Sequence, residues 1–210
     1  MTKEQKQAYE FIIYCYFGKI DNPVEAAIDR AYVDMAAHTL KGFGADYKTK
    51  WECRYNATQT ITKALESIDD NFCDWHSNLC MKIKTTYENH ISFSHGQAQK
   101  WVNMTMKYLY VFKLVFEVMK DDRLKKIPAF FQSNENISKL HIPLDNYILK
   151  ELKFESLEPW SKMNEIQYRE FINNNDKNIQ WELENWNIAA ENYKQIDSKS
   201  YSNYKIKRNV

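Results

Sequence analysis

The chain has 210 residues, a net charge of +1, 44% hydrophobic and 15% aromatic residues, and only 4 Gly and 4 Pro. This apolar content with so little net charge excludes a disordered chain, and the shortage of Gly and Pro excludes collagen-like and linker-rich classes. Few turn residues also disfavour an all-β protein, so the composition favours a helical domain with a substantial core.

Helical signals begin at the N-terminus. Thr2 and Gln5 fit a capping box, and the apolar stripe that follows them ends at Gly18. Pro23 suits the first position of a second helix, which is predicted to stop at Gly42. The same periodicity predicts two further helices, over 51–68 and 70–87.

A longer helix is predicted from Gln97 to about Lys120. It is apolar on almost every side, as is typical of a helix at the centre of a bundle. After it, Asn134-Glu135-Asn136 indicates a loop. Shorter helices are predicted from Pro143 and over 163–173 and 179–193.

No run of alternating residues indicates a strand, so the predicted fold class is all-α, a compact helical bundle. We expect one helical domain over 1–194, with 1–95 and 96–194 as candidate lobes around a helix-hairpin-helix element. A polar tail over 195–210 is expected to be flexible.

The location is predicted from the absence of targeting signals. The charged N-terminus has no apolar core after it, and the longest apolar run, 101–119, carries Lys107 and Lys113. Neither a signal peptide nor a membrane span is therefore expected, and the predicted location is cytoplasmic. Four Cys at irregular spacing do not form a disulfide framework.

Charge is uneven along the chain. Seven basic and three acidic residues give +4 over 100–126, whereas five basic and nine acidic residues give −4 over 150–193. The cationic segment is a candidate for contact with phosphates. The alternative is that these charges only solvate helix faces.

Two short segments combine residues that can carry chemistry. The first, Gly-Gln-Ala-Gln-Lys at 96–100, leads into a helix, where unpaired backbone N–H groups suit a phosphate. Lys100 is a candidate nucleophile, because a partly desolvated lysine gives up its proton more readily. In the second segment Asp145 follows Pro143 at a helix start, where its carboxylate can stabilise a developing cation or orient a water.

These segments resemble the helix-hairpin-helix DNA glycosylases, which carry Gly-x-Gly-x-Lys in a hairpin and Pro-x-Asp at the next helix start. The archaeal-type 8-oxoguanine DNA glycosylases are nearest, and the likeness covers about 50 residues. Ala98 replaces the second Gly of the hairpin. The 45 residues between Lys100 and Asp145 (145 − 100) exceed the usual gap and imply an insertion over 121–139.

The resemblance implies a DNA-repair hydrolase that excises a modified or damaged base, with AP-lyase activity as a further implication. Lys100 would attack C1′ and form a Schiff base, and Asp145 would stabilise positive charge on the sugar. The implied partner is DNA, without cofactor or metal; the iron–sulfur branch is excluded because all four Cys precede Gly96. The implied DNA-binding residues are those before the lysine: Gly96, Gln97, Ala98 and Gln99.

An extruded base needs aromatic walls. The candidates for them are Trp101, Phe131 and Trp160. Trp181 and Trp186, five residues apart, cannot share a helix face closely, so at most one of them lines a given pocket.

Other interpretations stay open. The chain can be a non-catalytic helical module that binds protein or nucleic acid, with Gly96 starting a core helix and Asp145 as an acid favoured by a helix dipole.

Arg30 and His38 lie near the spacing of HEPN-type ribonucleases, with one residue more between them than that pattern allows. Walker, Gly-x-Ser-x-Gly and dinucleotide-binding motifs are absent.

A zinc site is a further alternative. Cys73, His76 and Cys80 share one helix face and, with Cys53, would supply four ligands. The same pattern fits a buried helix face, because free Cys packs as a small apolar residue.

Overall fold

The computed structural model describes residues 1–40, 46–154 and 158–192. All regular structure in these residues is helical, which confirms the predicted all-α class. The tail predicted over 195–210 and the helix stop at Gly42 lie outside the described residues. In the described part, no helix is long and apolar enough to cross a membrane.

In the residues that the structure describes, α-helices and 3₁₀ turns follow one another without intervening strands. Their bounds are α1 Lys3–Phe17, α2 Pro23–Thr39, α3 Tyr47–Leu65, α4 Phe72–Thr85, α5 His95–Met119, η2 Asp122–Lys126, η3 Ala129–Gln132, α6 Asn134–Ser138, α7 Asn146–Glu151, η4 Trp160–Lys162 and α8 Glu165–Asn173. Residues 179–192 are also helical.

Local signals explain where the first two helices begin and where α1 ends. Thr2 and Gln5 form the predicted capping box at α1. Gly18 closes this helix at φ +73°, a conformation that side chains with a Cβ rarely adopt. Asn22 caps α2 and Pro23 takes its first position, as predicted.

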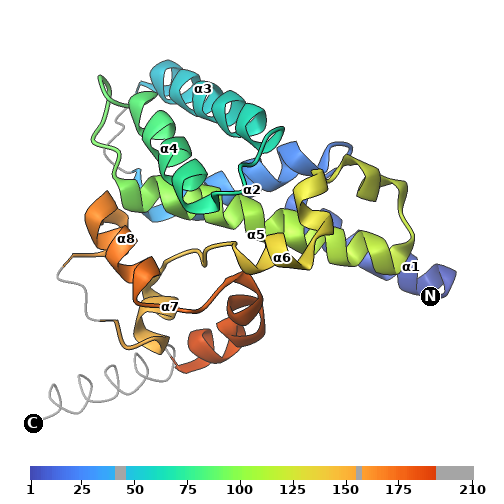
Figure 1. The fold of residues 1–210 in the computed structure, drawn as a ribbon. Coiled ribbons are helices and arrows are strands. Elements are labelled where there is room, and N and C mark those ends of the chain that lie inside the picture. Colours follow the sequence, from blue (N-terminus) through green and yellow to red (C-terminus); the bar gives the residue numbers. More distant parts are fainter. Residues whose placement is uncertain (41–45, 155–157, 193–210) are drawn as a thin grey trace, which may run out of the picture.

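The α5 helix is the centre of the molecule, as predicted. Figure 1 shows it crossing the middle of the ribbon, with α3 and α4 on one side and α7, α8 and the helix over 179–192 on the other. It packs chiefly against α2, and 18 of its 25 residues are buried. Residues on several of its faces therefore contact different parts of the chain.

The core consists of two hydrophobic clusters. The larger one extends from Ile13 to Leu140 and adds Ile179, and the smaller one, within 142–181, packs around Tyr168 and Phe171. The clusters divide near residue 141 and not at the boundary predicted between the candidate lobes, 95/96. That boundary would separate α5 from α2, the helix against which it packs most closely.

Two local predictions are also corrected. Asn134-Glu135-Asn136 lies in α6, a short helix capped by the Ser133 side chain, and not in a loop. α5 begins at His95, two residues before the predicted start at Gln97. The reason is that Ser94 caps the helix and forms a second capping box with Gln97.

Candidate active site

The segment predicted to be a phosphate-binding hairpin is the first part of α5. Ser94 Oγ accepts the N–H of Gln97 at 2.9 Å, and Met163 O accepts the N–H of Gly96 at 2.8 Å. The backbone N–H groups of Gly96 and Gln97, which the prediction assigned to a phosphate, are therefore bonded within the protein.

Tight packing explains the glycine in this segment. A Cβ on Gly96 would stand 1.8 Å from the carbonyl oxygen of Trp160, so only glycine fits against η4. Gln97, Ala98 and Gln99 are buried as well. The prediction that these four residues contact DNA is corrected: they are buried inside the protein.

Lys100 and Asp145, 45 residues apart in the chain, meet in space. Lys100 Nζ donates a hydrogen bond to Asp145 Oδ2 at 2.8 Å. Only 7% of the Lys100 side chain and 17% of the Asp145 side chain are exposed. A buried ion pair adds little to stability, because desolvation offsets the attraction, so a pair placed in a cavity is a candidate for chemistry.

Asp145 is held by the helix that it caps. Its Oδ1 accepts the backbone N–H groups of Tyr147 at 2.9 Å and Ile148 at 3.0 Å, at the start of α7. Burial opposes ionisation, but the charge of Lys100 and these hydrogen bonds outweigh it and hold the pKa of Asp145 below its usual value. One oxygen of the carboxylate is thus fixed to the backbone while the other faces the amine.

Both residues line a cavity of about 750 Å³, which we call the lysine cavity. Its walls come from α1, α2, α5, the start of α7, η4 and the helix over 179–192. They are largely aromatic or aliphatic, with a few polar groups, as in many small-molecule pockets. The lining residues are Tyr9, Ile12, Ile13, Tyr16, Phe17, Asp34, Ala37, Lys100, Met104, Lys107, Tyr108, Val111, Val115, Asp145, Asn146, Tyr147, Trp160 and Trp186.

A second ion pair lies beside the same cavity. Lys107 Nζ bonds to the carboxylate of Glu182 at 2.7 Å, with 11% and 1% of the two side chains exposed. Burial raises the pKa of Glu182 in spite of the lysine. Each lysine also faces a tryptophan ring: Lys100 Nζ is 5.9 Å from the ring centroid of Trp160, and Lys107 Nζ is 5.6 Å from that of Trp186.

Another wall of the cavity carries a hydrogen-bonded carboxylate. Asp34 accepts from the Tyr108 hydroxyl and, at 2.6 Å, from Arg30. The hydroxyls of Tyr16 and Tyr108 are 2.8 Å apart, so this cluster ties α1 to α2 and α5. Burial and the Asp34 carboxylate both raise the pKa of Tyr108, which stays protonated.

Of the three residues predicted as aromatic walls, one lines the lysine cavity. Trp160 lines the cavity, but Trp101 is a core residue whose indole N–H donates to Ile28 O at 3.0 Å, and Phe131 is also fully buried in the core. Trp186 lines the cavity, whereas Trp181 packs against the smaller cluster. The pair Lys107 and Glu182 was not predicted, because its partners lie 75 residues apart.

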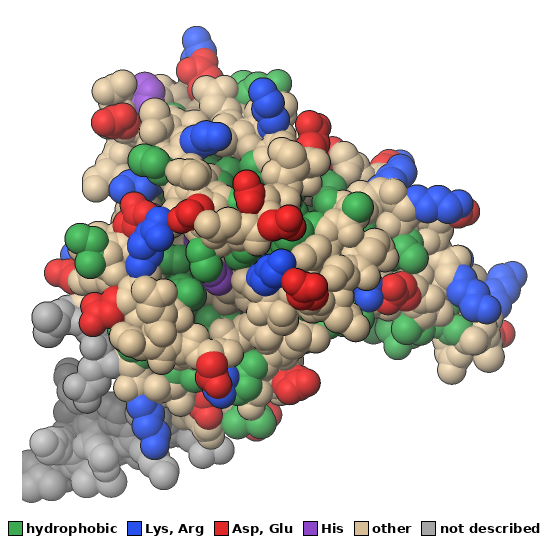
Figure 2. All heavy atoms as spheres, in the orientation of Figure 1, with side chains coloured by type: hydrophobic (Ala, Val, Ile, Leu, Met, Phe, Trp, Pro, Cys, Tyr) green, Lys and Arg blue, Asp and Glu red, His purple; other side chains and the backbone are tan. Residues whose placement is uncertain are grey.

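The cationic segment over 100–126 does not form a free basic surface. Besides Lys100, Lys107 and the exposed Lys120, three of its basic side chains pair with carboxylates and one donates to a carbonyl. These are Lys113 with Glu117, Arg123 with Glu10 and Asp121, Lys125 with Asp122, and Lys126 with Asp21 O. On the face shown in Figure 2, basic and acidic side chains are interspersed.

The zinc alternative finds no support in the described residues, where no group of three or more His, Cys, Asp or Glu can hold a metal ion. Cys80 Sγ is 3.8 Å from the ring nitrogens of His76, but Cys73 Sγ instead contacts His141 Nε2 at 3.5 Å. For the ribonuclease alternative, Arg30 pairs with Asp34, and the His38 side chain lies outside the described residues.

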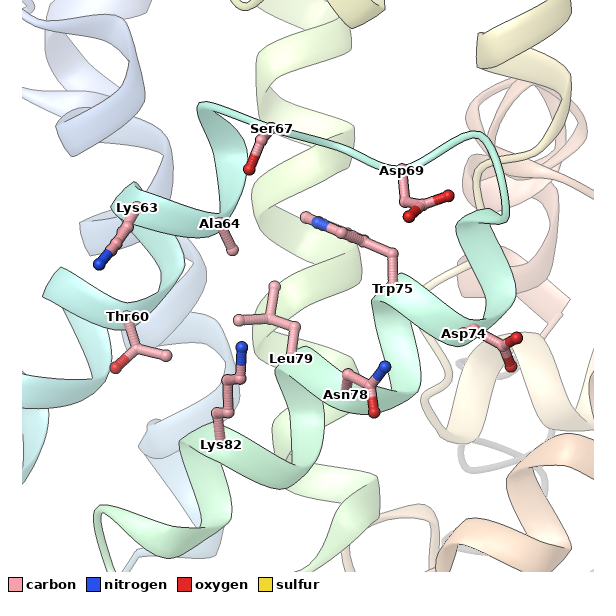
Figure 3. Close-up of a pocket in the computed structure, with 10 residues that line it drawn as sticks. All are labelled: Thr60, Lys63, Ala64, Ser67, Asp69, Asp74, Trp75, Asn78, Leu79 and Lys82. Carbon is pink, nitrogen blue, oxygen red and sulfur yellow. The ribbon is translucent and has the colours of Figure 1, made fainter.

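A pocket of about 520 Å³ between α3 and α4 offers a contrast (Figure 3). Trp75 stands near its middle, with Lys63 and Lys82 toward one end and Asp69 and Asp74 toward the other. These four charged residues are exposed. The pocket therefore lacks a desolvated charged group, which the lysine cavity has.

Comparisons of the chain with protein-family models, with curated proteins and with solved structures found no match.

Proposed function

We propose that this protein is a DNA glycosylase that excises a modified or damaged base, with Lys100 as nucleophile and Asp145 as its charge partner. The observation that supports this best is the 2.8 Å contact between Lys100 Nζ and Asp145 Oδ2 at the wall of an aromatic cavity. Asp145 also caps the start of α7, which agrees with the Pro-x-Asp element that helix-hairpin-helix DNA glycosylases carry at a helix start.

The chemistry requires an amine that can lose a proton. Asp145 Oδ2 already accepts a hydrogen bond from the Lys100 ammonium and can take that proton. Nζ then bonds to C1′ of the nucleotide as the bond from C1′ to the base breaks. The base leaves with the bonding electrons and takes up a proton, which Asp145 or water supplies, and opening of the sugar ring gives the imine.

The cavity suits an extruded base. A base removed from the duplex needs stacking faces and polar groups for its edge. Trp160 and Trp186 supply faces, and Lys107 and Tyr108 place polar atoms at the lining. A volume of about 750 Å³ leaves space for a base together with its sugar.

Borohydride trapping tests the proposal. The protein is incubated with duplexes that carry an abasic site or 8-oxoguanine, and borohydride reduces any imine to a stable amine. We expect a covalent protein–DNA adduct that is absent in Lys100→Gln. Lys82→Gln, which changes an exposed lysine of the pocket between α3 and α4, is the matched control and should form the adduct normally.

An adduct that persists in Lys100→Gln would contradict the role of this amine. If no lesion gives an adduct and no duplex binds even at low salt, the glycosylase proposal fails. The non-catalytic helical module would then be the better interpretation.

A further inference from the structure

A buried polar network lies on the flank of α5 next to the lysine cavity. We call it the Asn103 network, and its members are His76, Gln99, Asn103, His141 and Tyr168. They come from α4, α5, α8 and the segment before α7. Each of them is buried, and none is a candidate for direct contact with a ligand in the lysine cavity.

Asn103 is the centre of this network. Its Oδ1 accepts from His76 Nε2 at 2.8 Å, so that ring nitrogen carries the hydrogen. Its Nδ2 lies 3.0 Å from each of three acceptors: Gln99 Oε1, Ile142 O and the Tyr168 hydroxyl. A fully buried amide with these partners is costly to disrupt, because each lost bond leaves a desolvated polar group.

Two hydrogen bonds, one from Asn103 and one to Gln99, hold the backbone just before Asp145. Asn103 holds the carbonyl of Ile142, and Gln99 Oε1 accepts the N–H of Leu144 at 3.4 Å. Asp145 follows directly in the chain. Gln99 and Asn103 flank Lys100 on α5, so one helix both carries the amine and holds the segment that carries its carboxylate partner.

The remaining members brace the same segment at its start. His141 Nδ1 is 2.9 Å from the Tyr168 hydroxyl, and its Nε2 contacts Cys73 Sγ at 3.5 Å. Burial lowers the pKa of His141 to about 4 and that of His76 well below its usual value, so both rings are neutral near pH 7. The segment from 141 to 144 is thus tied to α5 and α8 by side chains that carry no charge.

We propose that Asn103 and Gln99 are positioning residues, which set the distance between Lys100 Nζ and the Asp145 carboxylate through the backbone of Ile142 and Leu144. Their effect on the ion pair follows from the structure itself. Their effect on catalysis rests on the proposed glycosylase function.

Three variants separate positioning from simple stability. Asn103→Leu removes every hydrogen bond of the amide at similar volume. Gln99→Met removes the side-chain oxygen that accepts from Leu144 N–H and from Asn103 Nδ2. If Asn103→Leu does not fold, Gln99→Met alone tests the positioning role. Thr105→Val is the control, since Thr105 is equally buried on α5 but bonds only within the helix, to Trp101 O.

The first readout is the pKa of Asp145, measured by carboxyl-carbon NMR. In the folded Asn103 and Gln99 variants we expect this pKa to rise toward the ordinary value of an aspartate, because a more distant cation stabilises the carboxylate less. In Thr105→Val it should stay at the wild-type value. An unchanged Asp145 pKa in a folded Gln99→Met or Asn103→Leu protein would overturn the proposal.

The second readout is the single-turnover rate of borohydride trapping on an abasic duplex, which we expect to fall at least about tenfold in the two variants while duplex affinity is retained. A folded variant with a wild-type trapping rate would overturn the positioning role. If the wild-type protein forms no adduct with any lesion and binds no duplex, the glycosylase proposal fails, and the Asp145 titration still tests the role of Asn103 and Gln99.

Discussion

Replacing Asp145 by Asn isolates the charge of the Lys100–Asp145 pair from the helix cap. Asparagine is as good an N-cap as aspartate, so the bonds to the N–H groups of Tyr147 and Ile148 can persist. What disappears is the negative charge 2.8 Å from Lys100 Nζ, which leaves a buried ammonium without its partner. The perturbation is therefore electrostatic, and the shape of the site changes little.

The expected loss of unfolding free energy at pH 7 is about 2–3 kcal/mol. Breaking a fully buried pair costs about 3–5 kcal/mol, and the 17% exposure of Asp145 reduces that figure. Urea denaturation followed by tryptophan fluorescence measures the loss. Because the pKa of Asp145 is lowered in the folded state, its contribution is present at neutral pH and is lost as pH falls below about 4. Wild type and Asp145→Asn should therefore converge in acid.

A double-mutant cycle with Lys100→Met gives the coupling energy directly, and we expect about 2 kcal/mol. The control cycle uses Asp122→Asn and Lys125→Met, a pair whose side chains are 93% and 82% exposed, where solvent screens the charges and no coupling beyond the experimental error is expected. If the Lys100 and Asp145 variants were additive within the error of the control cycle, the reasoning about a desolvated pair would be refuted.

Two further predictions concern the packing and titration of buried groups. Gly96→Ala should destabilise the protein by about 1–3 kcal/mol or more, because its methyl group would meet the Trp160 carbonyl; an unchanged urea midpoint would show that η4 can move away freely. Burial lowers the pKa of His95 and of His141 to about 4, below the value of about 6.5 in an unfolded chain. The unfolded state therefore binds more protons as pH falls from 6.5 to 4, and stability should drop by about 3 kcal/mol for each ring across that window. Urea midpoints at several pH values test this, and a wild-type pH slope in His141→Phe would contradict it.

Features set by neighbouring residues were predictable from the sequence. The capping box at Thr2, the proline at the start of α2 and the apolar character of α5 are local patterns, and each appears in the structure. The start of α5 was misplaced although its signal was present. Ser94 and Gln97 are spaced as a capping box, but the glycine between them also fits the Gly-x-Gly-x-Lys hairpin pattern, which favours a later helix start.

Features set by long-range packing were not predictable in this way. No periodicity indicates that α1 forms a wall of the lysine cavity or that Glu182 lies against Lys107. The local context of Lys100 and of Asp145 marks each as a candidate, and the resemblance to a family is what pairs them. Their contact depends on how the segment after 140 packs against α5, and Asn103 and Gln99 show that side chains inside the core govern that packing.

The α5 helix fixes the axial separation of the two lysines that line the cavity. Lys100 and Lys107 are seven residues apart, which corresponds to about 10.5 Å along a helix axis and to almost two full turns. This length is the axial separation of the two lysine backbones, from which both side chains reach the lysine cavity. Deleting one residue between them would shorten the interval by about 1.5 Å and also rotate Lys107 by about 100°, away from the cavity and from Glu182. The axial interval between the two lysine positions can therefore change only in whole turns if both are to stay on the cavity side of α5, and substitution of the intervening side chains leaves it unchanged.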